Sequence, residues 1–176
     1  MDKLRNIKAE DIHNFKFVHE PDFSHDGKHV LFAVTQTDGD DGYSTSVWKY
    51  TLGGDSVSLF FNNRKISSLR WSKDGKSFLY LTTSPRAESV CSEIWVADSN
   101  GQDRRCVVSL ENSRIGEPRW SPNSREIYFI SDYDSDLLPV SKSDFKFVTR
   151  MNYRFDGDGV YGDRYMHIFK LDSKGE

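Results

Sequence analysis

Four basic side chains interleave with four aromatic ones in the segment 142–155. They are Lys142, Lys146, Arg150 and Arg154 on the one hand, and Phe145, Phe147, Tyr153 and Phe155 on the other. A guanidinium group presents a planar fork of N–H donors that matches a carboxylate or a backbone carbonyl. The pattern favours a loop that binds a carboxylate or a backbone carbonyl, with Arg150, Tyr153 and Arg154 as the candidate binding residues.

Two other interpretations of this segment stay open. Aromatic stacking beside basic residues also suits single-stranded nucleic acid, although the acidic neighbours Asp144, Asp156 and Asp158 weaken this interpretation. The plainest alternative is a solvated hairpin whose aromatic side chains pack on neighbouring strands.

The histidines and acidic turns predict no metal site and no cofactor. His25 and His29 are four residues apart but stand on either side of a predicted turn, which disfavours zinc. The segment 132–136 alternates aspartates like a calcium loop. However, Leu137 replaces the glycine and Ser143 replaces the glutamate that such a loop needs.

The sequence lacks the pattern of a serine nucleophile. A nucleophile elbow needs G-x-S-x-G between a strand and a helix. The nearest match, Gly54-Asp55-Ser56-Val57-Ser58, lacks the second glycine and falls in a predicted hairpin. The chain by itself is therefore expected to be inactive.

The composition favours a folded, soluble chain. Its 176 residues include 24 Lys plus Arg against 27 Asp plus Glu, and 14% are aromatic, which is not the signature of disorder. The near-neutral charge argues against a nucleic-acid partner, and no apolar run is long enough for a membrane span. The N-terminus lacks the apolar stretch of a signal peptide. Cys91 and Cys106 are too few for a disulfide framework, so two half-buried thiols and a cytoplasmic location are expected.

One motif occurs three times at nearly constant spacing. It combines an aromatic residue, a serine, a turn pair, a basic residue and two alternating apolar residues, over 21–32, 69–80 and 118–129. Its aromatic residues Phe23, Trp71 and Trp120 are 48 and 49 residues apart. A second motif follows at Trp48, Trp95 and Phe169, after 25, 24 and 49 residues, so about 25 residues are inserted in the third copy.

Each copy predicts short antiparallel strands. Asp26-Gly27 and Asp74-Gly75 stand between runs of aromatic and branched residues, which is a strong hairpin signal. In the third copy the turn pair is Asn123-Ser124, so a looser or different turn is expected there. Four strands in about 48 residues fit a β-propeller blade, with a sandwich of hairpins as the alternative.

The sequence thus predicts an all-β fold of about three propeller blades in an incomplete ring. A lead-in over 1–16 precedes blade one at 17–61, blade two at 66–110 and blade three at 115–176, which contains an insertion at 132–163 and lacks its last strand. Because propellers have about four to eight blades, the chain is expected to be a fragment of a longer protein or to close by oligomerising. Its open blade faces are expected to self-associate.

Two segments narrow the family. Ile7–Asp11 with the following 17–28, and Arg150–Gly159 with the following His167–Phe169, resemble the matching parts of acylaminoacyl-peptidase-type enzymes. These enzymes belong to the prolyl oligopeptidase family of serine peptidases. The resemblance covers nearly the whole chain, but only the N-terminal portion of such an enzyme.

The resemblance implies a seven-bladed propeller that caps a C-terminal α/β-hydrolase domain with a Ser-Asp-His triad. The expected function is that of a non-catalytic segment, which shapes and gates the access of short peptides to a hydrolase domain absent from this chain. That domain and short peptides are the expected partners. The segment 142–155 is then expected to form a loop over the substrate cavity, in which Arg150, Tyr153 and Arg154 bind the peptide. The alternative is a propeller-type scaffold for protein interactions with no associated enzyme activity.

Overall fold

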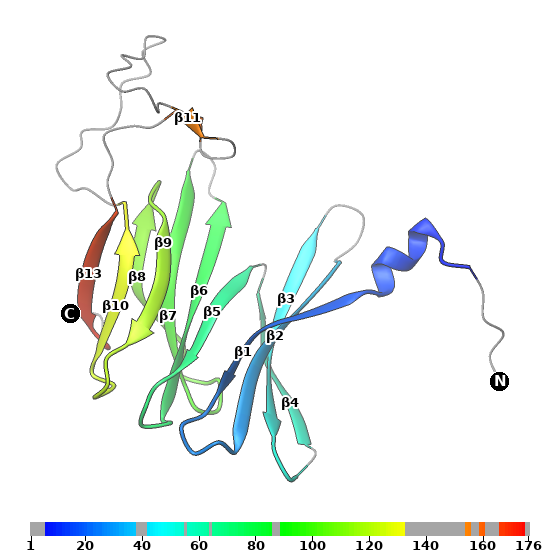
Figure 1. Ribbon diagram of the computed structural model, residues 1–176, viewed down its shortest axis with the longest axis horizontal. Coiled ribbons are helices and arrows are strands. Elements are labelled where there is room, and N and C mark those ends of the chain that lie inside the picture. Colours follow the sequence, from blue (N-terminus) through cyan, green and yellow to red (C-terminus); the bar gives the residue numbers. More distant parts are fainter. Residues whose placement is uncertain are drawn as a thin grey trace.

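The computed structural model describes residues 6–37, 42–54, 56–63, 65–85, 89–132, 154–155, 159–160 and 166–174. Over these residues the chain forms one short 3-10 helix, η1 (Ala9–Asn14), followed by antiparallel sheets that stand next to one another (Figure 1). In this described part, no helix is long and apolar enough to cross a membrane.

Two sheets have four strands each, in chain order. The first contains β1 (Lys16–Phe23), β2 (His29–Thr37), β3 (Tyr43–Thr51) and β4 (Ser56–Asn63). The second contains β5 (Ile66–Trp71), β6 (Ser77–Pro85), β7 (Val90–Asp98) and β8 (Arg105–Glu111). Four antiparallel strands that pair in sequence order form a propeller blade. We call these sheets blade one and blade two.

The third sheet has three strands in the order β13-β10-β9, and we call it blade three. They are β9 (Ile115–Trp120), β10 (Glu126–Ser131) and β13 (His167–Asp172). Between β10 and β13 in the chain, β11 (Arg154–Phe155) pairs with β12 (Gly159–Val160). The all-β class and the antiparallel blades are therefore confirmed, and the three blades form no closed ring in the described residues.

The turn between the first two strands of each blade has the same hydrogen bonds. In blade two the Ser72 Oγ donates to Asp74 Oδ1 over 2.6 Å and accepts from the Ser77 N–H over 3.0 Å. Asp74 Oδ1 also accepts from the Lys76 N–H over 3.1 Å. Gly75 adopts a φ of 69°, which glycine takes without steric penalty.

The expectation of a different turn in the third copy is wrong. Asn123 Oδ1 accepts from Ser121 Oγ over 2.7 Å and from the Arg125 N–H over 3.0 Å, as the aspartate does in blade two. Ser124 takes a φ of 60°, close to that of Gly75. An amide oxygen can replace the carboxylate as acceptor, and the surrounding bonds hold a serine in a conformation that glycine adopts more easily.

Two hydrophobic cores lie between neighbouring blades. Alternate residues of β6 point to opposite sides, so Phe78 and Tyr80 join the core with blade one, whereas Leu79 and Leu81 join the core with blade three. Blade two is therefore covered on both faces.

Both cysteines are free thiols, but they do not face each other. Cys91 lies opposite Glu111 and Cys106 opposite Trp95 in the pairing of β7 with β8. Cys91 is buried and Cys106 is exposed, so the expected pair of half-buried thiols is wrong in this respect.

Candidate functional site

The first strands of the three blades form a row. β1 contacts β5, and β5 contacts β9, so residues about 50 positions apart become neighbours (Figure 1). In a propeller the blades surround a central channel, and strands that adjoin in this way run along its wall. We therefore take the polar side chains of β1, β5 and β9 as the candidate site and call them the inner row.

Each of these strands is interrupted by a bulge at the same place. Glu20, Ser68 and Glu117 have φ values of 54°, 54° and 51°, and the strand pairing shifts beside each of them. Positive φ is uncommon for residues other than glycine, and a bulge redirects the side chains around it. Each of the three residues stands three positions before the motif aromatic, yet their types do not match, so sequence analysis missed them.

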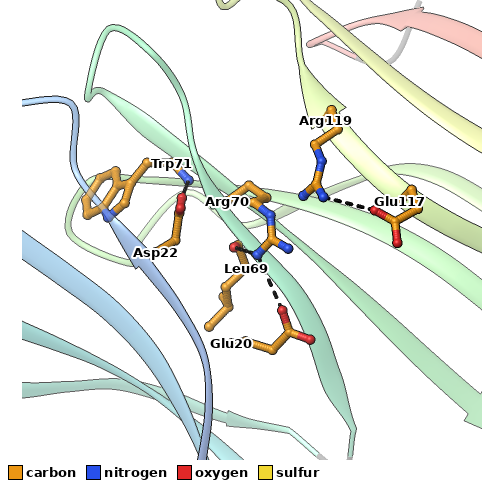
Figure 2. Close-up of polar contacts among 7 residues, drawn as sticks. All are labelled: Glu20, Asp22, Leu69, Arg70, Trp71, Glu117 and Arg119. Carbon is orange, nitrogen blue, oxygen red and sulfur yellow. Dashed lines mark hydrogen bonds and ion pairs between the residues drawn. The ribbon is translucent and has the colours of Figure 1, made fainter.

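The inner row joins blade one to blade two through two carboxylates. Glu20 Oε2 accepts from Arg70 Nη1 over 3.3 Å, and both side chains are 27% exposed. The same Arg70 nitrogen donates to the carbonyl of Leu69. Asp22 Oδ2 accepts from the backbone N–H of Trp71 over 2.7 Å. Figure 2 shows the two carboxylates reaching from β1 to β5.

In blade three the corresponding arginine makes a different contact. Arg119 Nη2 donates to Glu117 Oε2 over 2.9 Å, within the same strand (Figure 2). The matching position in blade two is Ser68, which has no charge to offer Arg119. Arg119 and Glu117 are 51% and 69% exposed, and an ion pair this exposed contributes little to stability. Both groups can therefore exchange their partner for a charged ligand.

The inner row offers recognition chemistry, and the candidate residues for nucleophilic or zinc chemistry lie in other elements. Ser56, the serine of the nearest elbow-like sequence, opens β4 after a hairpin turn. His25 lies in the first blade's turn, whereas His29 begins β2 and contacts Thr51 Oγ1 through Nδ1 over 3.2 Å. Within the described ranges, no three His, Cys, Asp or Glu side chains come together to hold a metal ion.

The predicted peptide-binding residues fall mainly outside the described residues. Arg150 and Tyr153 lie outside them, as do the other basic and aromatic residues of 142–149. Arg154 belongs to β11, where it pairs with Val160. The loop over a substrate cavity therefore stays a prediction. Of the calcium-like segment, only Asp132 is described, and its Oδ1 accepts from the Arg114 N–H over 2.6 Å.

The chain is similar in sequence to a peptidase. No family model matches it. It is 24% identical over 177 residues to the uncharacterized peptidase YuxL of Bacillus subtilis (strain 168), a match that covers 96% of this chain and 26% of that protein.

Solved structures with the same fold include peptidases and a lyase. The acylaminoacyl peptidase of Pyrococcus horikoshii matches 93% of this chain and 24% of its own, with a TM-score of 0.73 and 19% identity. The β-propeller domain of the Trilobed protease from Pyrococcus furiosus matches 67% of this chain and 34% of its own, with a TM-score of 0.55 and 21% identity. An oligogalacturonate lyase in complex with manganese matches 69% of this chain and 36% of its own, with a TM-score of 0.54 and 11% identity.

These matches confirm the resemblance inferred from the sequence. The similarity in sequence is to a peptidase, and the similarity in fold is to an acylaminoacyl peptidase and to a protease propeller domain. The chain spans about a quarter of the length of the peptidase YuxL and of the acylaminoacyl peptidase.

Proposed function

We propose that this chain is a non-catalytic propeller segment of a serine peptidase of the acylaminoacyl-peptidase type. In this proposal it shapes and gates the access of short peptides to an α/β-hydrolase domain, which hydrolyses them near their N-terminus through an acyl-enzyme. The observation that carries the proposal is the match of 93% of the chain to an acylaminoacyl peptidase. The thiols of Cys91 and Cys106 favour a cytoplasmic location.

The inner row supplies the chemistry for gating. Glu20, Arg70, Glu117 and Arg119 place two carboxylates and two guanidinium groups along three adjoining strands. A short extended peptide carries one terminal charge of each sign and can exchange its termini with these pairs. We further propose that Arg150, Tyr153 and Arg154 bind the peptide from the insertion.

The test compares the 176-residue chain with the product of the complete gene. A fluorophosphonate probe should leave the chain unlabelled and should label one serine of the complete protein. The complete protein should also cleave N-acylated peptides, with kcat/KM falling as the peptides become longer. A complete protein that the probe does not label would overturn the peptidase proposal and favour the interaction scaffold.

Gating has its own test in the complete protein. Replacing Glu20→Gln together with Arg70→Met removes one charge pair of the inner row and should change the ratio of kcat/KM between long and short peptides. The matched control is Lys170→Met, which removes an exposed pair with Glu126 on β10 and β13 and should leave that ratio unchanged. Equal ratios in both variants would contradict gating by the inner row.

We also propose that the uncovered faces of blades one and three self-associate. Val18 and Phe23 of β1 are 66% and 62% exposed on the face of blade one opposite to Leu31 and Ala33, and Ile168 of β13 is 79% exposed. Large apolar side chains exposed together on a sheet favour association. The mean mass in light scattering should therefore rise with chain concentration, and Phe23→Ser with Ile168→Ser should reduce the rise. A strictly monomeric chain at all concentrations would contradict this proposal.

A further inference from the structure

A polar cavity lies between blade one and blade two, apart from the inner row. Its volume is about 410 Å³, and its lining comes from Asn63 at the end of β4, Tyr80 of β6, Trp95 of β7 and the 102–104 connection to β8. None of these residues belongs to β1, β5 or β9, so the cavity is separate from the inner row. Its side chains therefore need an explanation of their own.

Arg104 supplies a positive charge to this cavity. Its guanidinium carbon lies 4.7 Å from the centre of the Phe61 ring, a cation–π contact that joins the connection to β4. Among the described residues, this guanidinium has no carboxylate or carbonyl partner. A guanidinium held over a ring keeps N–H donors free for a carboxylate, which it can bind through two parallel hydrogen bonds.

Tyr80 supplies a second donor. Its ring packs in the core, 5.1 Å from the Phe61 ring and 6.4 Å from the Trp95 ring, so its position is fixed. The Tyr80 hydroxyl is protonated at neutral pH, as in any tyrosine, and burial raises its pKa further, to about 12. No described group forms a hydrogen bond with this hydroxyl, although the residue lines the cavity.

Trp95 and Asp103 restrict what the cavity can hold. The indole N–H of Trp95 donates to Glu93 Oε2 over 3.0 Å. The polar group of this side chain is therefore already bonded, and the flat apolar ring is the part that can contact a ligand. Asp103 brings a carboxylate to the same lining, which repels a ligand with two negative charges more strongly than one with a single charge. A single carboxylate beside a flat apolar group suits these surroundings.

We propose that this cavity binds a monocarboxylate with a flat apolar group, its carboxylate on Arg104 and the Tyr80 hydroxyl and its flat group against Trp95. A free aromatic carboxylic acid and the C-terminal aromatic residue of a peptide both present this chemistry. The proposal does not depend on the proposed peptidase function.

The test is a calorimetric titration of the full chain with three probes: N-acetyl-L-phenylalanine, its amide, and Ala-Ala-Ala-Phe with a free carboxylate. Because a hydrogen bond to a charged group is worth more than a neutral one, the acid should bind about tenfold more tightly than the amide. Tighter binding of the peptide than of the acid assigns the site to peptide C-termini, and the reverse assigns it to free acids.

Three variants locate the binding. Arg104→Gln and Tyr80→Phe should each weaken binding of the acid and leave that of the amide unchanged. The matched control is Arg105→Gln, since Arg105 donates to the carbonyl of Ser173 in the turn after β13 over 3.0 Å and does not line the cavity. If Arg104→Gln fails to fold, the comparison of acid with amide on the wild type and on Tyr80→Phe still decides. Failure of the acid to bind, equal binding of acid and amide, or equal weakening by Arg105→Gln would overturn the proposal.

Discussion

At the scale of single residues, the turn aspartates connect charge to stability. The pKa of Asp26 is lowered mainly by a hydrogen bond from Ser24 Oγ, and next by one from the Lys28 N–H. For Asp74, burial raises the pKa, but hydrogen bonds from Ser72 Oγ and the Lys76 N–H outweigh it, so the pKa is lowered. In both turns the folded state therefore favours the ionised carboxylate.

This preference predicts a loss of stability in acid. A folded-state pKa below the unfolded value of about 3.9 gives stability that is present above that value and is lost as the pH falls through the folded pKa. Replacing Asp26→Asn and Asp74→Asn together should flatten the fall below about pH 4, because an amide has no charge to lose. Urea midpoints measured from pH 2 to pH 7 test this.

The third turn provides the internal control for these substitutions. Asn123 already accepts the same two hydrogen bonds, so an amide preserves the turn's geometry. The double variant should therefore stay folded at pH 7. An acid-induced fall as steep as that of the wild type would contradict the role given to the two carboxylates.

At the scale of elements, the inner row has one position where a charge pair is missing. Arg70 of blade two pairs with Glu20 of blade one. For Arg119 of blade three, the matching position in blade two is the uncharged Ser68, and Arg119 pairs with Glu117 of its own strand instead. Glu20 and Glu117 show that glutamate accepts the positive φ that Ser68 also has. The backbone of β5 can therefore carry a glutamate at position 68.

Ser68→Glu should add a pair between β5 and β9. We expect a stabilisation of up to about 1 kcal/mol that shrinks as salt is added, as is usual for partly exposed ion pairs. Denaturant unfolding of Ser68→Glu, Arg119→Met and the double variant gives the coupling between the two positions. If Ser68→Glu has the same effect with and without Arg119, the pair does not form.

The sequence predicted those parts of the strands that depend on neighbouring residues. Asp74-Gly75 and the alternation of Phe78 with Tyr80 are local, so the hairpin and its core face followed directly. The turn at Ser124 was predicted wrongly because the expectation rested on the missing glycine alone, whereas Asn123 Oδ1 makes the same two bonds as the aspartate of the other turns. The Asp74 N–H of blade two adds a bond to Ser124 Oγ over 3.1 Å, which the sequence does not show.

The bulges and the inner row could not be predicted in this way. Glu20, Ser68 and Glu117 share a backbone conformation, but the serine in the second copy breaks the side-chain pattern. The contact of Arg70 with Glu20 spans 50 residues of sequence and exists only once the blades are packed. Of the peptide-binding residues predicted in the insertion, the structure describes only the backbone of Arg154.

At the scale of the whole molecule, the fit between blades depends on close contacts of the turns. The turn after β7 packs on β4: an added Cβ at Gly101 would lie 2.6 Å from the nearest Phe60 ring carbon. Lys49 of β3 donates to the carbonyl of Ser99 over 3.2 Å and lies 5.0 Å from the centre of the Phe60 ring. Blade one therefore leaves no room for a side chain at Gly101.

Gly101→Ala should consequently destabilise the chain more than Gly75→Ala does. Both glycines have positive φ, 76° and 69°, so both variants carry a backbone strain of about 1–2 kcal/mol. Only Gly101→Ala adds overlap with Phe60, which we expect to contribute a further loss of about 1–3 kcal/mol. Thermal unfolding of the two variants measures the difference. Equal melting temperatures would show that the blades can shift apart at no cost.

The repeated bulge makes the charge of the inner row independent of the fold. Three blades hold position 20, 68 or 117 in one backbone conformation while the side chain changes from glutamate to serine to glutamate. At such a position the blade determines the backbone conformation, whereas the type of side chain is free to vary. A gene built by duplicating one blade can thus vary the charge along its inner row, one substitution at a time, without repacking any core.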